Sequence, residues 1–176
     1  MEKEIYEQPD ALGNTINGRL GEHDVLDNIF GLGSSDAFKN VKRIQFVACG
    51  TSLHAAKTAR KWFEDICEIP CYIDFASEYR YRNPIVEDHT LFVTISQSGE
   101  TADTLAALDY ARAEKYVGIV TICNVPTSTM ARNADWKIFT NAGPEIGVAS
   151  TKAFTTQLAA LLMLSLIHIS EPTRPN

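Results

Sequence analysis

The fold of this chain is indicated by one stretch, residues 91–110, which reads LFVTISQSGETADTLAALDY. Its first five residues form an apolar run of strand length, rich in β-branched and aromatic side chains, as in a buried parallel strand. A helical pattern follows, in which Ala102, Leu105, Leu108 and Ala111 are spaced three residues apart on one predicted face. The stretch therefore predicts a strand, a short polar loop and a helix in direct succession.

The polar loop, residues 96–101, has the composition of an anion-binding site. It contains three hydroxyl side chains, one carboxamide and Gly99, which can adopt a positive φ or let a ligand approach the backbone. The free N–H groups and the positive dipole end of the next helix favour an anion there. The alternative is that Ser96 and Thr101 only cap the helix, as serine and threonine often do. One cap would explain one hydroxyl and not three, so we expect a phosphate site.

Strands and helices alternate along much of the chain. Besides residues 91–95, strands are predicted at residues 43–49, 71–75, 117–123 and 135–140. This alternation predicts an α/β fold in which a parallel sheet is covered by helices on both faces. Ligands of such folds bind at the carboxyl ends of the strands. We therefore expect three polar segments to converge there: residues 49–52, 96–101 and 148–152.

Two further helices are predicted near the ends of the chain. The first has Pro9 in its first turn and Leu12, Ile16 and Leu20 on one face, and it ends at Gly21. The last helix begins near Lys152 and carries leucines around nearly its whole circumference. A helix that is apolar on all sides needs protein on all sides, so we expect some of these leucines to form an exposed patch.

Lys152 is a candidate phosphate partner or Schiff-base nucleophile. A lysine at a helix start is unfavourable unless an acid lies close by, and Glu145 is the candidate for that acid. We expect Lys152 to have a structural or supporting role, because nothing near it in the sequence suggests a desolvated amine.

Three motifs resemble the SIS (sugar isomerase) domain of the glutamine–fructose-6-phosphate aminotransferase family. They are CGTS at residues 49–52, SQSGETADTL at 96–105 and EIGVASTKAFTTQ at 145–157. The similarity runs from about Lys3 to Leu164 and implies a three-layer sandwich with a five-stranded parallel sheet, the flavodoxin-like SIS fold. It divides the chain into a helical lead-in (residues 1–40), the SIS domain (41–166) and a tail outside the family pattern (167–176).

The resemblance also implies which residues bind a sugar phosphate, either fructose 6-phosphate or glucosamine 6-phosphate. Phosphate contacts are implied for Ser96, Gln97, Ser98 and Thr101. Contacts to the phosphate or to sugar hydroxyls are implied for Ser52, Val148 (through its backbone) and Ser150, and Thr51 belongs to the same loop as Ser52. For Ser52 and Ser150, helix capping is the alternative role.

Members of this family have further parts that have no counterpart in this sequence. The resemblance implies a glutaminase domain that releases ammonia, a second SIS half whose Glu, Lys and His carry out ring opening and isomerisation, and a homodimer. We therefore expect a part of a cytoplasmic enzyme that binds substrate but has no catalytic residues of its own and no cofactor. Two alternatives remain: a stand-alone SIS sensor or regulatory module, and a deglycase-like SIS enzyme.

Composition and motif spacing exclude several other classes. The formal net charge of -6 argues against a nucleic-acid surface. No apolar signal core follows Met1, and the apolar run at residues 158–169 is too short to span a membrane. The four cysteines lack a C-x-x-C pair and are expected to be reduced thiols, and the four histidines show no metal-ligand spacing. Neither serine loop fits the G-x-S-x-G nucleophile elbow of a serine hydrolase.

Overall fold

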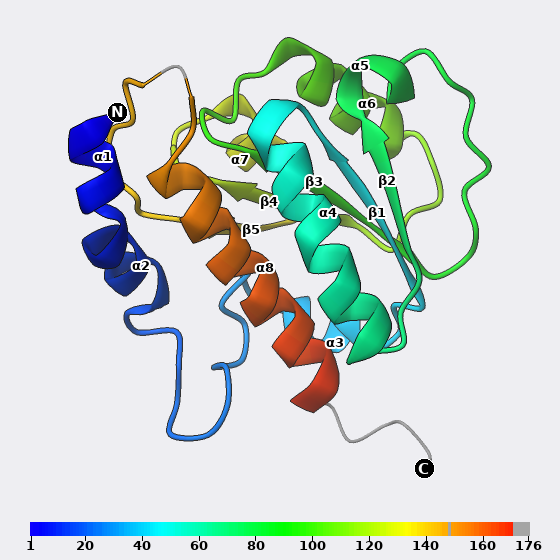
Figure 1. The fold of residues 1–176 in the computed structure, drawn as a ribbon. Helices are drawn as coiled ribbons and strands as arrows, with labels where there is room; N and C mark the ends of the chain where they lie inside the picture. The colour runs from blue at the N-terminus through cyan, green and yellow to red at the C-terminus, as the bar shows by residue number, and fades with distance from the viewer. Residues whose placement is uncertain (148, 171–176) are drawn as a thin grey trace.

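The computed structural model describes residues 1–147 and 149–170, the last two of these by their backbone alone. Its centre is a five-stranded, all-parallel sheet in the order β2-β1-β3-β4-β5. The strands are β1 (Arg43–Ala48), β2 (Cys71–Phe75), β3 (Thr90–Ser96), β4 (Ile119–Cys123) and β5 (Trp136–Phe139). The α/β fold predicted from the sequence, a three-layer sandwich around five parallel strands, is confirmed (Figure 1).

Eight helices are described around this sheet. They are α1 (Glu2–Tyr6), α2 (Gln8–Ile16), α3 (Ser34–Phe38), α4 (Gly50–Asp65), α5 (Ala76–Tyr79), α6 (Ala102–Arg112), α7 (Thr129–Asn133) and α8 (Lys152–Ser170). Helices α4 and α8 cover one face of the sheet, and α5, α6 and α7 cover the other (Figure 1). The prediction that helices cover both faces is therefore correct.

Successive side chains of the central strands point to opposite faces of the sheet and so divide the core into two halves. On β1, Phe46 packs with α4 and α8, whereas Val47 packs with α5 and α6. On β3, Val93 faces the first half and Phe92 the second. All of these side chains are fully buried, which explains why the strands read as continuous apolar runs in the sequence.

The buried face of α6 differs from the predicted one. Its buried residues are Thr104, Ala107, Leu108 and Ala111, while Ala102 is exposed. A strict three-residue spacing drifts around a helix of 3.6 residues per turn, whereas the i, i+3, i+4, i+7 pattern stays on one side. The helix ends at Arg112.

The N-terminal region is more helical than predicted, but its second helix is shorter. The segment before Pro9 forms α1, which the sequence did not predict, and α2 ends at Ile16. Gly18 then adopts a positive φ, so the chain turns, and Leu20 forms an isolated antiparallel bridge with Val25. The predicted single helix through Leu20 is therefore wrong.

Helix α8 is better covered than its sequence suggests. It lies between α2 and α4 and over the sheet, and it packs against both helices (Figure 1). Leu161 and Leu164 are fully buried, and Leu158 and Leu166 pack against the core. Among the α8 side chains that the structure describes, Leu162 is the large apolar one that remains exposed, at 38%. The expected broad leucine patch is absent from this described part of the chain, and the side chain of Ile169 lies outside it.

Candidate functional site

The predicted polar segments converge on a small cavity at the carboxyl ends of β1 and β3. The cavity has a volume of about 170 Å³. Its lining consists of Cys49, Thr51, Ser52, Ile95, Ser96, Gln97, Ser98, Thr101 and Ser150. Seven of the eight residues predicted to bind sugar phosphate thus lie around one space, and the eighth, Val148, lies outside the described residues. The described lining is made of hydroxyl, amide, thiol and aliphatic groups and carries no charged side chain.

Other hollows on the surface are larger, and one of about 590 Å³ shares Gln97 with the small cavity. One of about 480 Å³ lies between the first two helices and the loop before α8, and another of about 370 Å³ lies beside Leu20 and Leu166. Size alone would favour them. The small cavity is the better candidate because its polar groups converge at the edge of the sheet where parallel α/β folds bind ligands.

The serines of residues 96–101, here called the Ser96 loop, do not act as helix caps. Ser96 Oγ accepts a hydrogen bond from the backbone N–H of Gly99 at 3.0 Å, and Ser98 Oγ accepts one from Glu100 N–H at 3.2 Å. Thr101 is the N-cap residue of α6, but its side chain makes no capping bond. The Thr101 hydroxyl instead lies 3.2 Å from the Ser96 hydroxyl. The simple capping role considered for Ser96 and Thr101 is therefore wrong.

Two helices open onto the cavity with uncapped N-termini. The N-cap residue of α4 is Cys49 and that of α6 is Thr101, and neither makes a side-chain capping bond. Ser52 lies inside the first turn of α4, so it is not the cap either. Among the described residues, no side chain accepts from the first N–H groups of either helix, and each helix start has a positive dipole end, so the two starts create a favourable place for an anion.

Contacts with the start of α7 fix the shape of the Ser96 loop. Gly99 has a φ of +67°, and a Cβ at this position would come within 2.3 Å of Ser128 Oγ. The carbonyl of Gly99 accepts a bond from Met130 N–H at 3.2 Å, and Glu100 Oε1 accepts one from Thr129 N–H at 2.6 Å. The Thr129 bond lowers the pKa of Glu100. A glycine is thus required here by both backbone conformation and close packing.

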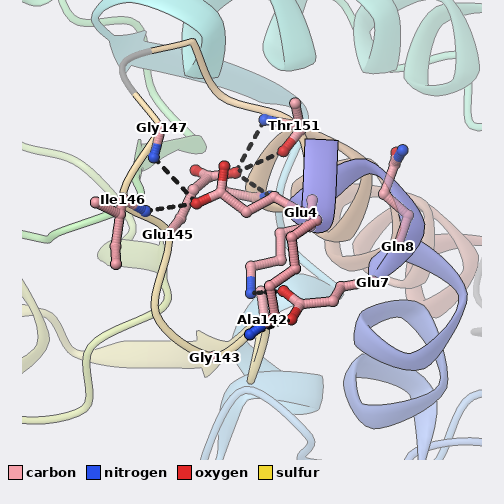
Figure 2. A network of polar contacts seen from close by, with 12 residues as sticks. Glu4, Glu7, Gln8, Ala142, Gly143, Glu145, Ile146, Gly147 and Thr151 are labelled. Atoms are coloured by element: carbon pink, nitrogen blue, oxygen red, sulfur yellow. Dashed lines mark hydrogen bonds and ion pairs between the residues drawn. The ribbon is translucent and has the colours of Figure 1, made fainter. Parts of the chain in front are cut away.

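A second carboxylate, Glu145, organises the segment that leads into α8. Its Oε1 accepts a bond from the N–H group of Thr151 at 2.9 Å (Figure 2). The same oxygen accepts the N–H of Ala153 at 3.2 Å, and Oε2 accepts the Ser150 hydroxyl at 3.2 Å. Glu145 therefore supplies the acceptor for the first N–H groups of α8 and also contacts a cavity residue. Neither role was predicted from the sequence.

Helix α1 holds the same segment from the other side. Glu4 is only 6% exposed, and its Oε1 accepts the N–H groups of Ile146 at 2.6 Å and Gly147 at 3.0 Å (Figure 2). The Gly147 and Ile146 bonds lower the pKa of Glu4 to about 2. Sequence reasoning missed this contact, because no local pattern relates Glu4 to positions 146 and 147.

Lys152 pairs with Glu7 and not with Glu145. Lys152 is 4% exposed, and its Nζ lies 2.7 Å from Glu7 Oε2. The sequence suggested Glu145 as the nearby acid and no strong desolvation, and the structure corrects both points. Lys152 lines the hollow beside α1 and is not among the residues that line the Ser96 cavity, so the structure gives no support for a Schiff-base role.

The described residues contain neither a metal-binding cluster nor a membrane-spanning helix. No group of three or more His, Cys, Asp or Glu side chains there could hold a metal ion. None of the helices in that part of the chain is long and apolar enough to cross a membrane.

Comparisons with known proteins point to one family. The chain is 57% identical over 166 residues to a glutamine–fructose-6-phosphate aminotransferase (isomerizing) from Idiomarina loihiensis, and 55% identical to the one from Pseudomonas aeruginosa. Each match covers 94% of this chain but 27% of the relative, so the chain spans about a quarter of those proteins.

A solved structure agrees with these sequence matches. The C-terminal domain of glucosamine-fructose-6-phosphate aminotransferase from Francisella tularensis superposes with a TM-score of 0.92 at 49% identity, over 96% of this chain and 47% of that one. The fold alone is shared with a glucosamine-6-phosphate deaminase from Thermotoga maritima, at a TM-score of 0.75 and 22% identity. The model of the SIS domain matches residues 37–167. The chain belongs to the SIS-domain family.

Proposed function

We propose that this chain is the first SIS half of a glutamine–fructose-6-phosphate aminotransferase and that it binds the sugar phosphate of that enzyme. The observation that carries the proposal is the convergence of seven polar side chains and two uncapped helix starts on one cavity. Identity of 54–57% to aminotransferases over nearly the whole chain favours this function over a stand-alone sensor or a deglycase.

In this proposal the Ser96 loop binds the phosphate. The oxygen of Ser98 already accepts a backbone N–H bond, so its hydroxyl proton is available to a phosphate oxygen. In the contact between Ser96 and Thr101 one hydroxyl donates to the other, so one of these two protons is also available. The Gln97 amide would add donors beside the start of α6, and Ser52 and Thr51 would do so at the start of α4. Ser150 and the backbone of Val148 are proposed to contact the sugar.

The chain is proposed to bind substrate without transforming it. Moving a proton between two sugar carbons needs a group that can accept and return it, and the described cavity lining has no carboxylate, amine or imidazole. The second SIS half would supply the acid and base, and a glutaminase domain would supply ammonia. A homodimer in the cytoplasm, with no cofactor, completes the proposed enzyme, which makes glucosamine 6-phosphate from fructose 6-phosphate.

Calorimetric titration tests the binding role. Fructose 6-phosphate should bind the folded chain and fructose should bind far more weakly, because the phosphate is the main contact. Ser98→Ala should weaken binding of fructose 6-phosphate by about 1–3 kcal/mol, the usual range for a hydrogen bond to a charged group. Thr58→Ala removes an exposed hydroxyl further along α4 and is the matched control. Equal affinity for fructose and its phosphate would overturn the proposal.

A further inference from the structure

Two serines of the cavity have opposite hydrogen-bond polarity. Each hydroxyl has one proton to donate and two lone pairs that can accept. Ser98 Oγ accepts from Glu100 N–H, which leaves its proton free. Ser150 donates its proton to Glu145 Oε2 at 3.2 Å, because a carboxylate accepts hydrogen bonds and does not donate them. Toward the cavity, Ser98 can thus still donate a hydrogen bond, whereas Ser150 can only accept one through a lone pair.

We propose that Glu145 is a positioning residue that makes Ser150 a hydrogen-bond acceptor and so directs Ser150 to a sugar hydroxyl rather than to the phosphate. A phosphate bears oxygens that accept, so it matches the donors of the Ser96 loop and not the lone pairs of Ser150. A sugar hydroxyl can donate to those lone pairs. The inference rests on the proposed function and deepens it, because it sets the direction in which the hexose phosphate lies.

The surroundings of Glu145 fix its carboxylate in this role. Its Oε1 is engaged by the N–H groups of Thr151 and Ala153, so Oε2 is left to face Ser150. The two residues that follow Glu145, Ile146 and Gly147, are held through their N–H groups by Glu4 of α1. An added Cβ at Gly147 would come within 2.5 Å of Glu4 Oε2, so this packing is close. The carboxylate therefore cannot turn away from Ser150 without breaking several bonds.

Glu145→Gln gives an almost isosteric test. The glutamine oxygen can keep the bonds from Thr151 and Ala153, while its NH₂ replaces Oε2 and donates to Ser150. The polarity of Ser150 is then reversed. Binding of fructose 6-phosphate and of inorganic phosphate is measured by calorimetry for the wild type, Glu145→Gln, Ser150→Ala and the double variant. Glu22→Gln, an exposed charge-matched change, is the control.

The expected result is a selective loss. Glu145→Gln should weaken the binding of fructose 6-phosphate on the order of tenfold, which is the cost of one mismatched hydrogen bond. The binding of inorganic phosphate should stay nearly unchanged. The double variant should bind fructose 6-phosphate no more weakly than Ser150→Ala, since Glu145 acts through Ser150. Should Glu145→Gln fail to fold, Ser150→Ala should still weaken the binding of fructose 6-phosphate and leave the binding of inorganic phosphate nearly unchanged.

The outcomes separate this inference from the function on which it rests. If the wild type does not bind fructose 6-phosphate, the proposed function fails and the inference fails with it. If the wild type binds fructose 6-phosphate, three results would overturn the positioning role alone. Glu145→Gln could bind as the wild type does, or it could lose affinity for both ligands equally. Its loss of affinity could also add fully to that of Ser150→Ala in the double variant.

Discussion

Glu7 and Lys152 form an ion pair at 2.7 Å although 145 positions separate them in the sequence. The lysine is almost completely buried, and it lies in the first turn of α8, where the helix dipole disfavours a cation. The N-terminal glutamate compensates for both effects. Together with the Glu4 bonds to Ile146 and Gly147, this pair attaches the first turns of the chain to the segment that leads into α8.

Glu7→Gln should lower the free energy of unfolding, because it leaves the buried Lys152 ammonium without its carboxylate. Replacing both residues, Glu7→Gln with Lys152→Met, should recover most of the loss, since no buried charge remains. Urea unfolding of the three proteins measures this, with Glu2→Gln on the exposed side of α1 as a control that should change little. A double variant less stable than Glu7→Gln would contradict the interpretation.

The contribution of Glu4 to stability should depend on pH in a defined window. The Gly147 and Ile146 N–H groups lower its pKa to about 2 from an ordinary value of 4.5, and the Met1 ammonium lies 3.2 Å from its other oxygen. A carboxyl group whose pKa is lower in the folded state stabilises that state when the pH is above the pKa of the unfolded chain. This stabilisation is lost as the pH falls through the pKa of the folded chain. The stability difference between the wild type and Glu4→Gln should therefore be constant above about pH 5 and shrink toward pH 2.

Urea unfolding of these two proteins at several pH values checks this prediction. The comparison with Glu4→Gln removes the contribution of the other carboxyl groups, which titrate in the same range. A difference that stays the same from pH 6 to pH 2.5, or that grows in acid, would show that the Glu4 carboxylate does not hold the two N–H groups.

Gly99→Ala should destabilise the chain by about 1–3 kcal/mol, because the new Cβ meets Ser128 and the backbone has a positive φ. It should also weaken phosphate binding, since the Ser96 loop must shift. Gly13→Ala is the matched control: Gly13 lies inside α2 with nothing within 4 Å of the added Cβ, and the change should stabilise by about 0.5–1 kcal/mol. Thermal unfolding of both variants tests the predicted changes in stability, and titration with phosphate tests the predicted change in binding.

Local patterns predicted the sheet and much of the cavity. The strand at residues 71–75 has the bounds predicted for it, because a short, mostly apolar segment between a proline and a helix start is a local signal. The Ser96 loop was found for the same reason: its hydroxyls, its glycine and the helix that follows are contiguous. Parallel topology then places residues 49–52, here called the Ser52 loop, beside the Ser96 loop without further information.

Contacts between distant segments could not be predicted in this way. Nothing in the first eight residues shows that Glu4 will meet the N–H groups of Ile146 and Gly147, since no local pattern relates these positions. The same holds for the partner of Lys152, for which the nearer Glu145 was the natural candidate. For helix α8 the sequence predicted an exposed leucine patch that the described residues do not show. The contact with α2 that covers the helix is tertiary, and composition does not reveal it.

The central claim, that the cavity between the Ser52 and Ser96 loops binds the phosphate of a hexose phosphate, is tested most directly by an amide NMR titration. Fructose 6-phosphate and inorganic phosphate should both shift the amide signals of Ser52, Ser98 and Thr101, and fructose at the same concentration should not. Fructose 6-phosphate alone should also shift Ser150. Shifts confined to the hollow around Lys3 and Asp10, or equal shifts with fructose, would contradict the account.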